Sequence, residues 1–255
     1  MNKFVEETIN GKKVVILVEV DENELAKRGE VIRADDKEFW GDATEIGAKA
    51  FSKTSIKYVE IPEQIKEISG WAFSGCDSLK GVILPKGLVT INPYTFTDCT
   101  SLESAILPEG LRHIENGAFS GCSALKNVII PITVTRMGKG AFSRCSSLES
   151  VDIPNVKTVD IGVFSGCYKL ARVTIAEGVD LVERWAFADC ISLEEVVVPS
   201  SVQIIREEAF LNCASLKQIK VPKTANVYTR AFEGCLKDIE VITFECTRND
   251  AEENE

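Results

Sequence analysis

A phenylalanine, usually preceded by alanine, returns every 22 or 23 residues along most of this 255-residue chain. It occurs at Phe51, Phe73, Phe96, Phe119, Phe142, Phe164, Phe187, Phe210 and Phe232. An aliphatic residue stands five positions before each of them, and a cysteine stands three positions after each except Phe51, where Thr54 replaces it. A unit of this length cannot bury its own apolar residues, so the repeat predicts units that stack on one another.

The stretch L-x-x-V-x-I of each repeat predicts a short strand. In the fourth copy, Leu125, Val128 and Ile130 precede Pro131, and the apolar residues alternate near the end of this stretch. Proline then ends the strand because it cannot donate to a ladder. The second half of the repeat, I-x-x-x-A-F-x-x-C, is too short for a full helix and predicts a tight turn or a single helical or 3₁₀ turn. One strand and one turn make one coil of a solenoid.

The pattern L-x-x-V-x-I-P-x-x-V-x-x-I-x-x-x-A-F-x-x-C resembles the leucine-rich repeats of the BspA type, also called the Treponema pallidum type, over roughly residues 43–242. The resemblance implies a leucine-rich-repeat solenoid of about nine repeats. It implies a curved, right-handed parallel β-sheet on the concave side and short turns, or 3₁₀ or α turns, on the convex side. Members of this family are typically bacterial surface or secreted proteins, and several are regarded as adhesins. The family motif is structural, so the resemblance transfers no catalytic residue.

The first residues of the chain do not follow the repeat. Segments 4–9 and 13–20 flank Asn10-Gly11, the dipeptide favoured in a type I′ hairpin turn. In the second segment the aliphatic residues at 14, 16, 18 and 20 would share one face of the strand. Asp21-x-x-Glu24 resembles a capping box, and a short helix is expected to follow it and to end near Gly29.

These features divide the chain into three parts. We predict an N-terminal cap over residues 1–40, with a separate binding module as the alternative, because a solenoid must cover its first apolar coil. The solenoid is expected over residues 41–246, with a last coil shortened by two residues and a closing strand at 239–242. Residues 247–255, TRNDAEENE, predict an acidic disordered tail.

The repeated cysteines raise the question of metal or disulfide chemistry. They are Cys76, Cys99, Cys122, Cys145, Cys167, Cys190, Cys213 and Cys235. Zinc sites use cysteines a few residues apart, but the closest pair, Cys235 and Cys246, is separated by eleven positions. Equivalent residues on neighbouring strands lie ~4.8 Å apart, whereas a disulfide needs Cβ atoms at roughly 3.8 Å. We therefore favour a row of buried free thiols, which suits a reducing compartment, over the alternative of disulfides.

Charge and hydropathy disfavour two classes of partner. The formal net charge is −10 and no basic block occurs, so neither nucleic acid nor anionic membrane is expected to bind. The apolar run at 14–18 is too short to insert into a membrane. No secretion signal is recognisable, so the sequence predicts a cytoplasmic protein if it is complete, whereas the resemblance implies the cell surface or secretion.

Nothing in the sequence argues for an enzyme. His113 is the only histidine, and no G-x-S-x-G nucleophile motif or phosphate-binding Walker loop accompanies it. We expect no catalytic residue, no cofactor and no metal.

Candidate partner-binding residues come from the strand register. The positions just before and just after the central strand residue are expected to face the concave side, ending with Asp238 and Glu240 in the last coil. The candidates are Tyr58, Ile83, Ile106, Asn127, Ile129, Asp152, Arg172 and Val197. The three isoleucines would form an apolar stripe, which either reflects the β-propensity of isoleucine or marks a partner surface.

The sequence therefore predicts a non-catalytic protein-recognition module, adhesin-like by resemblance, that binds an unidentified protein and is itself a monomer. An intracellular scaffold for protein–protein interaction is the alternative, and a hydrolase built on the repeat scaffold is a weaker one.

Overall fold

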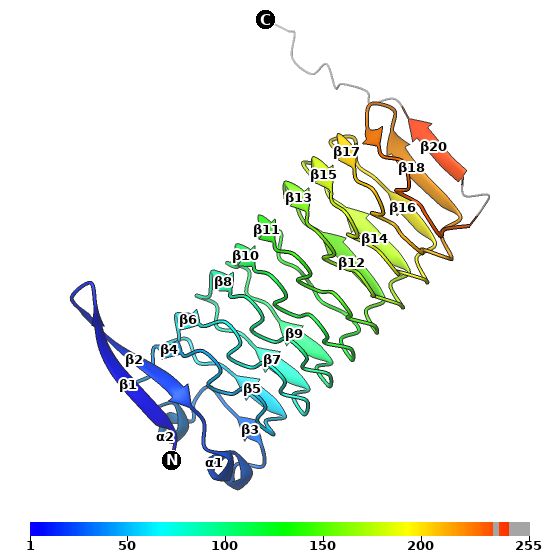
Figure 1. Ribbon diagram of the computed structural model, residues 1–255. Helices are drawn as coiled ribbons and strands as arrows, with labels where there is room; N and C mark the ends of the chain where they lie inside the picture. Colours follow the sequence, from blue (N-terminus) through cyan, green and yellow to red (C-terminus); the bar gives the residue numbers. More distant parts are fainter. Residues whose placement is uncertain (237–239, 245–255) are drawn as a thin grey trace, which may run out of the picture.

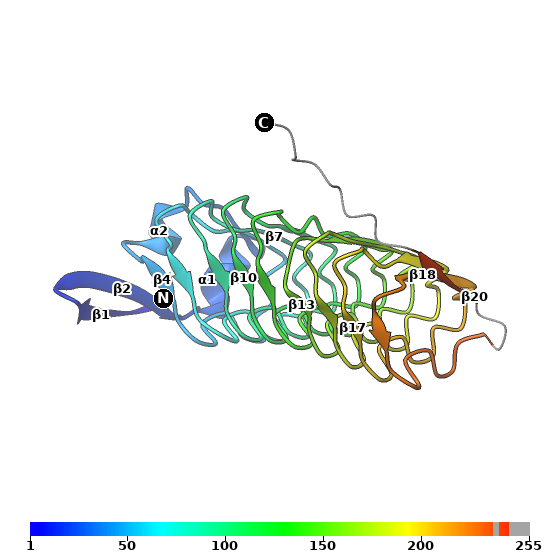
Figure 2. The ribbon, with the colours of Figure 1, turned by 90° about the horizontal axis from the view of Figure 1, so that it is seen from above.

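The computed structural model describes residues 1–236 and 240–244, which form a parallel β-solenoid with little helix. Figure 1 shows the coils stacked in a single elongated row, with the N-terminal hairpin at one end and the last strand at the other. Figure 2 shows the same row from above, with the hairpin projecting beyond the first coils. The predicted solenoid, with one coil for each repeat, is confirmed.

One side of the solenoid carries the predicted strands, in all coils but that of residues 127–131, and we call this surface the sheet face. Four of these strands form one parallel sheet: β3 (Val31–Ile32), β5 (Tyr58–Glu60), β7 (Gly81–Ile83) and β9 (Ser104–Ile106). Five more form a second: β12 (Ser150–Ile153), β14 (Arg172–Ile175), β16 (Glu195–Val197), β18 (Gln218–Pro222) and β20 (Glu240–Phe244). Between them, residues 127–131 form no strand and are joined to β12 only by a bridge from Asn127 to Ser150.

A second set of strands was not foreseen. The aliphatic residue five positions before each phenylalanine lies in a two-residue strand rather than in a turn. These strands are β4 (Glu45–Ile46), β6 (Glu67–Ile68), β8 (Thr90–Ile91), β10 (His113–Ile114), β11 (Arg136–Met137), β13 (Thr158–Val159), β15 (Leu181–Val182), β17 (Ile204–Ile205) and β19 (Asn226–Val227). Stacking places equivalent residues such as Ile114 and Met137 side by side, so their backbones pair although two residues show no periodicity of their own.

The expected tight turn follows each phenylalanine. Cys122 N–H donates to the carbonyl of Phe119 at 3.2 Å, and Leu125 N–H donates to the carbonyl of Cys122 at 3.1 Å. These bonds span three residues, as in a 3₁₀ helix, but the turn does not continue into a regular helix.

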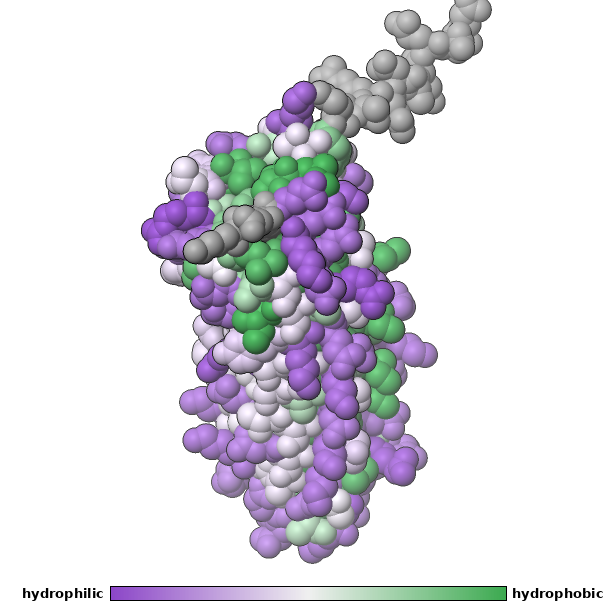
Figure 3. Space-filling model, turned by 90° about the vertical axis from the view of Figure 1, so that its right-hand side faces the viewer, coloured by the Kyte–Doolittle hydropathy of each residue, from purple (hydrophilic) through white to green (hydrophobic). Residues whose placement is uncertain are grey.

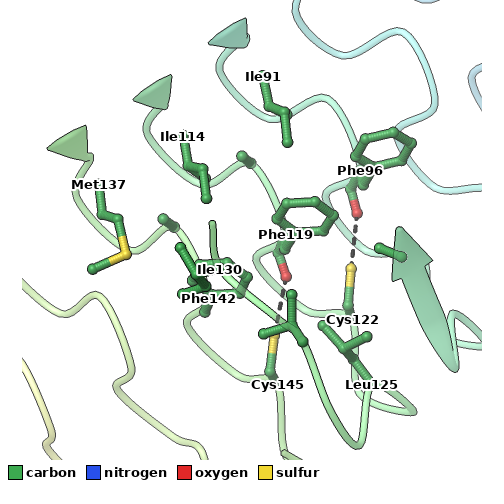
Figure 4. Packing of buried hydrophobic residues seen from close by; sticks show 14 of the residues in the cluster. Ile91, Phe96, Ile114, Phe119, Cys122, Leu125, Ile130, Met137, Phe142 and Cys145 are labelled. Atoms are coloured by element: carbon green, nitrogen blue, oxygen red, sulfur yellow. Dashed lines mark hydrogen bonds between the residues drawn. The ribbon is translucent and has the colours of Figure 1, made fainter. Parts of the chain in front are cut away.

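The repeated phenylalanines stack through the centre of the molecule. From Phe51 to Phe232 the centroids of neighbouring rings lie between 4.5 and 5.7 Å apart. Figure 4 shows three of these rings, Phe96, Phe119 and Phe142, among the aliphatic residues of the same coils. Offset stacking adds to the free energy of apolar burial, and the result is one core that runs through all coils.

The cysteines lie beside this stack as free thiols, and the interpretation as a row of buried thiols is confirmed for the seven from Cys76 to Cys213, whereas Cys235 is half-buried. Each thiol donates to the carbonyl of the phenylalanine in the preceding coil. Cys122 Sγ lies 3.1 Å from the oxygen of Phe96, and Cys145 Sγ lies 3.2 Å from that of Phe119 (Figure 4). Burial raises the pKa of the Cys145 thiol to about 12, which makes it unreactive at neutral pH.

The N-terminal hairpin is confirmed. β1 (Lys3–Ile9) and β2 (Lys12–Glu19) are antiparallel, and Asn10 and Gly11 both have positive φ, as a type I′ turn requires. β2 continues as a parallel neighbour of β4, which attaches the hairpin to the solenoid. Val15 and Leu17 are the strand residues that reach the core, whereas the opposite face, which carries the residues at 14, 16 and 18, is half-buried.

Two short helices follow the hairpin. The predicted one, α1 (Glu22–Lys27), begins at Asp21, whose side chain accepts from Asn23 N–H at 2.8 Å. The capping box is incomplete because Glu24 pairs with Arg28 instead of the Asp21 N–H. The other helix, α2 (Lys37–Trp40), is too short to produce a periodic pattern and was not predicted. Strand β3 also lies within the predicted cap yet pairs with β5, so the domain boundary at residue 40 stays a prediction.

The register of the last coil differs from the expectation. Glu240 pairs with Gln218 and Ile242 pairs with Lys220, so these two residues take the face positions that were assigned to Asp238 and Glu240. That assignment was wrong because the last coil is not shortened: 22 residues separate Gln218 from Glu240, as in other coils. Asp238, the predicted start of the closing strand and the predicted tail at 247–255 lie outside the described residues.

Candidate partner-binding face

The strand register brings the predicted face positions into two rows on each sheet. Tyr58, Gly81 and Ser104 are paired across β5, β7 and β9, as are Glu60, Ile83 and Ile106. The same relation joins the residues at 150, 172, 195 and 218, and those at 152, 174, 197 and 220, in the second sheet. Central strand residues point inward and their neighbours point outward, so all eight candidates are exposed on the sheet face.

The N-terminal half of this face has an apolar groove of about 260 Å³. Tyr58, Gly81, Ile83 and Ile106 line it, together with backbone and side chains of the neighbouring strands. The Tyr58 ring lies across Gly81, and a β-carbon at that position would come within 3.1 Å of Tyr58 Cδ1. The absence of a side chain at Gly81 therefore makes this groove possible.

The predicted isoleucine stripe is only partly assembled. Ile83 and Ile106 are paired neighbours, but Ile129 lies in the coil without a strand and has no ladder partner in the described residues. Its side chain is 83% exposed, compared with 58% for Ile106. Three residues further on, Ile132 is 87% exposed and extends this apolar surface around Pro131.

Sequence reasoning missed Ile132, although a signal was present. In the other coils, the residue that follows the strand-ending proline, or Ala176 in its place, is charged or polar, namely Glu63, Lys86, Glu109, Asn155, Glu177, Ser200 and Lys223. An isoleucine at this outward turn position is therefore an exception that core packing does not require.

The C-terminal half of the sheet face is more polar. A wide groove of about 670 Å³ runs between β14 and β16 and is lined by Arg172, Thr174, Glu195 and Val197 among others. Lys220 Nζ lies 3.5 Å from Glu195 Oε1, so charges of both signs occur there. The two halves of the face therefore differ in chemistry: the N-terminal groove is lined mainly by apolar residues, with Arg33 and Glu60 beside them, and the C-terminal half is more polar and mixed in charge.

The described residues contain no cluster of histidine, cysteine, aspartate and glutamate that could hold a metal ion. His113 lies in β10, away from the sheet face, with its Nδ1 3.4 Å from Thr90 Oγ1. Within the described ranges, no helix has the length and apolar character needed to cross a membrane.

Comparison with known proteins identifies the same repeat. The model of the BspA-type leucine-rich repeat region matches residues 44–167 and 141–254, with six copies of the repeat. A search of curated proteins finds no match.

Solved structures that are similar to this chain include two leucine-rich repeat proteins. A leucine-rich repeat protein from Eubacterium ventriosum is 26% identical over 76% of this chain and 63% of its own, with a TM-score of 0.61. The leucine-rich repeat protein of T. pallidum is 28% identical over 74% of this chain and 87% of its own, with a TM-score of 0.62. The chain thus spans less than two thirds of the length of the first of these relatives.

Proposed function

This chain belongs to the BspA-type leucine-rich repeat proteins, and from that premise we propose that it is a non-catalytic module that recognises another protein. The observation that carries the proposal is the exposed apolar surface of Ile83, Ile106 and Ile129 on the sheet face. Exposed apolar residues that lie side by side, as Ile83 and Ile106 do, commonly mark a site of interaction on a protein surface.

The fold does not require these isoleucines. Each coil is held by residues that point inward, such as Val128 and Ile130 in the coil of Ile129, and by the stacked phenylalanines. Ile129 contributes no ladder pairing in the described residues and little burial. A residue that the core does not need is free to serve recognition.

The finer proposal is an adhesin-like or host-interaction protein of a bacterial surface, whose partner lies across the candidates Tyr58, Ile83, Ile106, Asn127, Ile129, Asp152, Arg172 and Val197. The apolar half of the face would supply most of the binding free energy, and the charged half, with Asp152 and Arg172, would restrict which partners fit. We propose that the chain acts as a monomer, so that the whole face stays open to its partner.

A second candidate function is an intracellular scaffold. The eight free thiols among the described residues favour it, because unpaired cysteines persist most easily in a reducing compartment. Their burial protects them from oxidation elsewhere, so this observation has less weight than the apolar face.

Supporting the non-catalytic part of the proposal, His113 has Thr90 as its neighbour, and no carboxylate of the described residues hydrogen-bonds to its ring. A serine-hydrolase triad needs such a carboxylate to orient the histidine.

The test is affinity capture from bacterial lysate and from host extracellular matrix, followed by titration of the captured protein. The double variant Ile106→Asp/Ile129→Asp should weaken its binding roughly tenfold or more, because it places charge in the apolar contact. The matched control is Val89→Asp/Ile191→Asp, which changes two exposed apolar residues away from the sheet face. Equal binding by wild-type protein and the sheet-face variant, with unchanged circular dichroism, would reject the proposal.

A further inference from the structure

One position in each coil, two residues before the phenylalanine, has a left-handed backbone in all nine coils. Its φ lies between 58° and 70° throughout. The residues are Lys49, Trp71, Tyr94, Gly117, Gly140, Gly162, Trp185, Glu208 and Arg230. Glycine adopts this conformation without steric cost, whereas other residues lose roughly 1–2 kcal/mol there. Bulky aromatic residues at three of these positions therefore need a reason other than the backbone.

Trp71 and Tyr94 occupy this position in neighbouring coils and form an exposed aromatic pair. Their ring centroids lie 5.1 Å apart with an interplanar angle of 19°. Trp71 is 44% exposed and Tyr94 is 39% exposed, so neither residue is there to fill the core. The Tyr94 ring lies over Gly117, where a β-carbon would come within 2.5 Å of the ring. The pair is thus a fixed aromatic surface that rests on a residue without a side chain.

The polar groups of this pair have no partner within the described residues. Trp40 Nε1 donates to the carbonyl of Arg33 at 2.8 Å, and Trp185 Nε1 donates to Glu208 at 2.7 Å. For Trp71 Nε1 and Tyr94 Oη, the described ranges contain no hydrogen-bonding partner. Trp185 has the same backbone conformation, but Arg184 covers its ring at 4.3 Å. Internal contacts therefore account for Trp185 and leave Trp71 and Tyr94 unexplained.

The surface beside the aromatic pair is rich in hydroxyl groups and carries an ion pair, in which Arg144 Nη2 lies 3.5 Å from Asp98 Oδ1 and 3.5 Å from Ser120 Oγ. Gly117 and Gly140 continue the row of the aromatic residues without side chains. The row one residue after each phenylalanine carries Ser74, Thr97, Ser120 and Ser143, and the oxygens of Ser120 and Ser143 lie 2.8 Å apart. Neither row has a charged residue in these coils, although the chain has a net charge of −10.

We propose that the Trp71–Tyr94 pair and the adjacent hydroxyl row bind a neutral saccharide. The carbon–hydrogen face of a pyranose ring packs on aromatic rings, and its hydroxyls can accept from Trp71 Nε1 and exchange hydrogen bonds with Tyr94 Oη and the serine hydroxyls. Arg144, whose Nη2 reaches Ser120 Oγ, is already paired with Asp98, so an anionic ligand would have to compete with that carboxylate.

An extended peptide fits this surface less well. Peptides that dock as strands use unpaired backbone groups, but Trp71 N–H already donates to Pro93 O at 3.1 Å. Tyr94 N–H likewise donates to Asn116 O at 2.9 Å. A saccharide needs only side-chain donors and an aromatic surface, and this site offers both. It is separate from the sheet face, so the inference does not depend on the proposed function.

The experiment presents the full chain to an array of neutral and sialylated glycans and then titrates soluble trisaccharides of glucose, galactose and N-acetylglucosamine, with tryptophan fluorescence as the readout. We expect at least one neutral glycan to bind and Trp71→Gly or Tyr94→Gly to weaken its affinity at least tenfold. Glycine already occupies this position in three other coils, so these variants should fold. The matched control Trp185→Gly should retain the affinity.

Three results would overturn the inference. They are the binding of no neutral glycan, an equal loss of affinity in the Trp71 and Trp185 variants, or tighter binding of sialylated than of neutral glycans. Thermal unfolding of each variant separates a lost site from a lost fold. If Trp71→Gly is unfolded, Trp71→Lys replaces it, since Lys49 holds this position in the first coil.

Discussion

The two ends of the array bury their apolar residues to different extents. At the N-terminal end, Phe39 and Trp40 of α2 are buried and lie 6.0 and 6.1 Å from the ring of Phe51, the first of the stack. The hairpin adds β2 beside β4. The first coil therefore has an apolar partner on both sides, and its phenylalanine is as inaccessible as those of the interior coils.

At the C-terminal end, core positions meet solvent. Phe232 is only partly buried, and Val241, whose counterparts in β16 and β18 are fully buried, is 44% exposed. Figure 3 shows hydrophobic side chains gathered near this end of the described chain. The difference shows that a coil owes its burial to its neighbours, as expected of a quasi-one-dimensional array.

The largest effect should come from removing a ring between two neighbours. Phe119→Ala is expected to lower the free energy of unfolding by about 3–5 kcal/mol, because Phe96 and Phe142 hold the cavity open. Phe232→Ala should cost about half as much, since this ring has one stacking neighbour among the described residues. Urea denaturation measures both values. Equal losses would show that position in the array does not matter.

A smaller effect is expected at the N-terminal cap. The Asp36 side chain accepts from Phe39 N–H at 3.0 Å and pairs with Arg28 at 2.6 Å, which fixes α2 over the first coil. Asp36→Ala should lower the free energy of unfolding by about 1 kcal/mol, as lost helix caps do. Asp36→Asn keeps a capping oxygen and should cost less. If the two substitutions are indistinguishable from wild type, the cap does not support the array.

The same residue predicts a pH dependence. Burial opposes ionisation of Asp36, but the hydrogen bonds from Arg28 and Phe39 N–H and the charge of Arg28 outweigh it and lower its pKa. A carboxyl with a lowered pKa stabilises the fold above its unfolded value of about 3.9, and this contribution is lost as the pH falls through the folded value. Wild type and Asp36→Asn should thus differ most above the unfolded pKa of about 3.9, and the difference should shrink as the pH falls through the lowered pKa of the folded state. A difference that does not change with pH would contradict this account.

Thiol reactivity tests the comparison without disturbing the fold. Cys235 is half-buried at the last rung of the row, and a hydrogen bond with Cys213 lowers its pKa, whereas burial raises that of Cys145. In a Cys246→Ser background, N-ethylmaleimide should label Cys235 roughly tenfold or more faster than Cys145. Mass spectrometry of digests taken at timed intervals measures the labelling rate of each cysteine. Unfolding in urea should abolish the difference between the two rates. Labelling of Cys145 first would contradict the burial described here.

Much of the fold could be predicted because packing repeats. Phe119, Cys122 and Leu125 recur at fixed spacing, and each recurrence reports the same inward environment, so the coil and its core follow from the sequence. The hairpin at Asn10-Gly11 was also predictable, since few residue pairs accept its two positive φ values. Strand β10 and helix α2 were not, because two or four residues have no period to detect.

The candidate site was predictable only as a surface. Strand alternation places Ile106 and Val197 outward, and the structure agrees. It could not reveal that the ladder is interrupted at Ile129, since the residues there are as strand-forming as those of other coils. The outward positions carry no packing constraint, so they contain no signal that identifies a partner.

The most direct test of the account is native-state hydrogen exchange, read as peptides along the array. We predict that the coil around Phe51, covered by α2, exchanges as slowly as the coil around Phe142, while the coil over residues 227–236 exchanges much faster. Trp40→Ala should then release the first coil and leave the coil of Phe142 protected. Uniform protection along the array, or a C-terminal coil as slow as the N-terminal one, would contradict it.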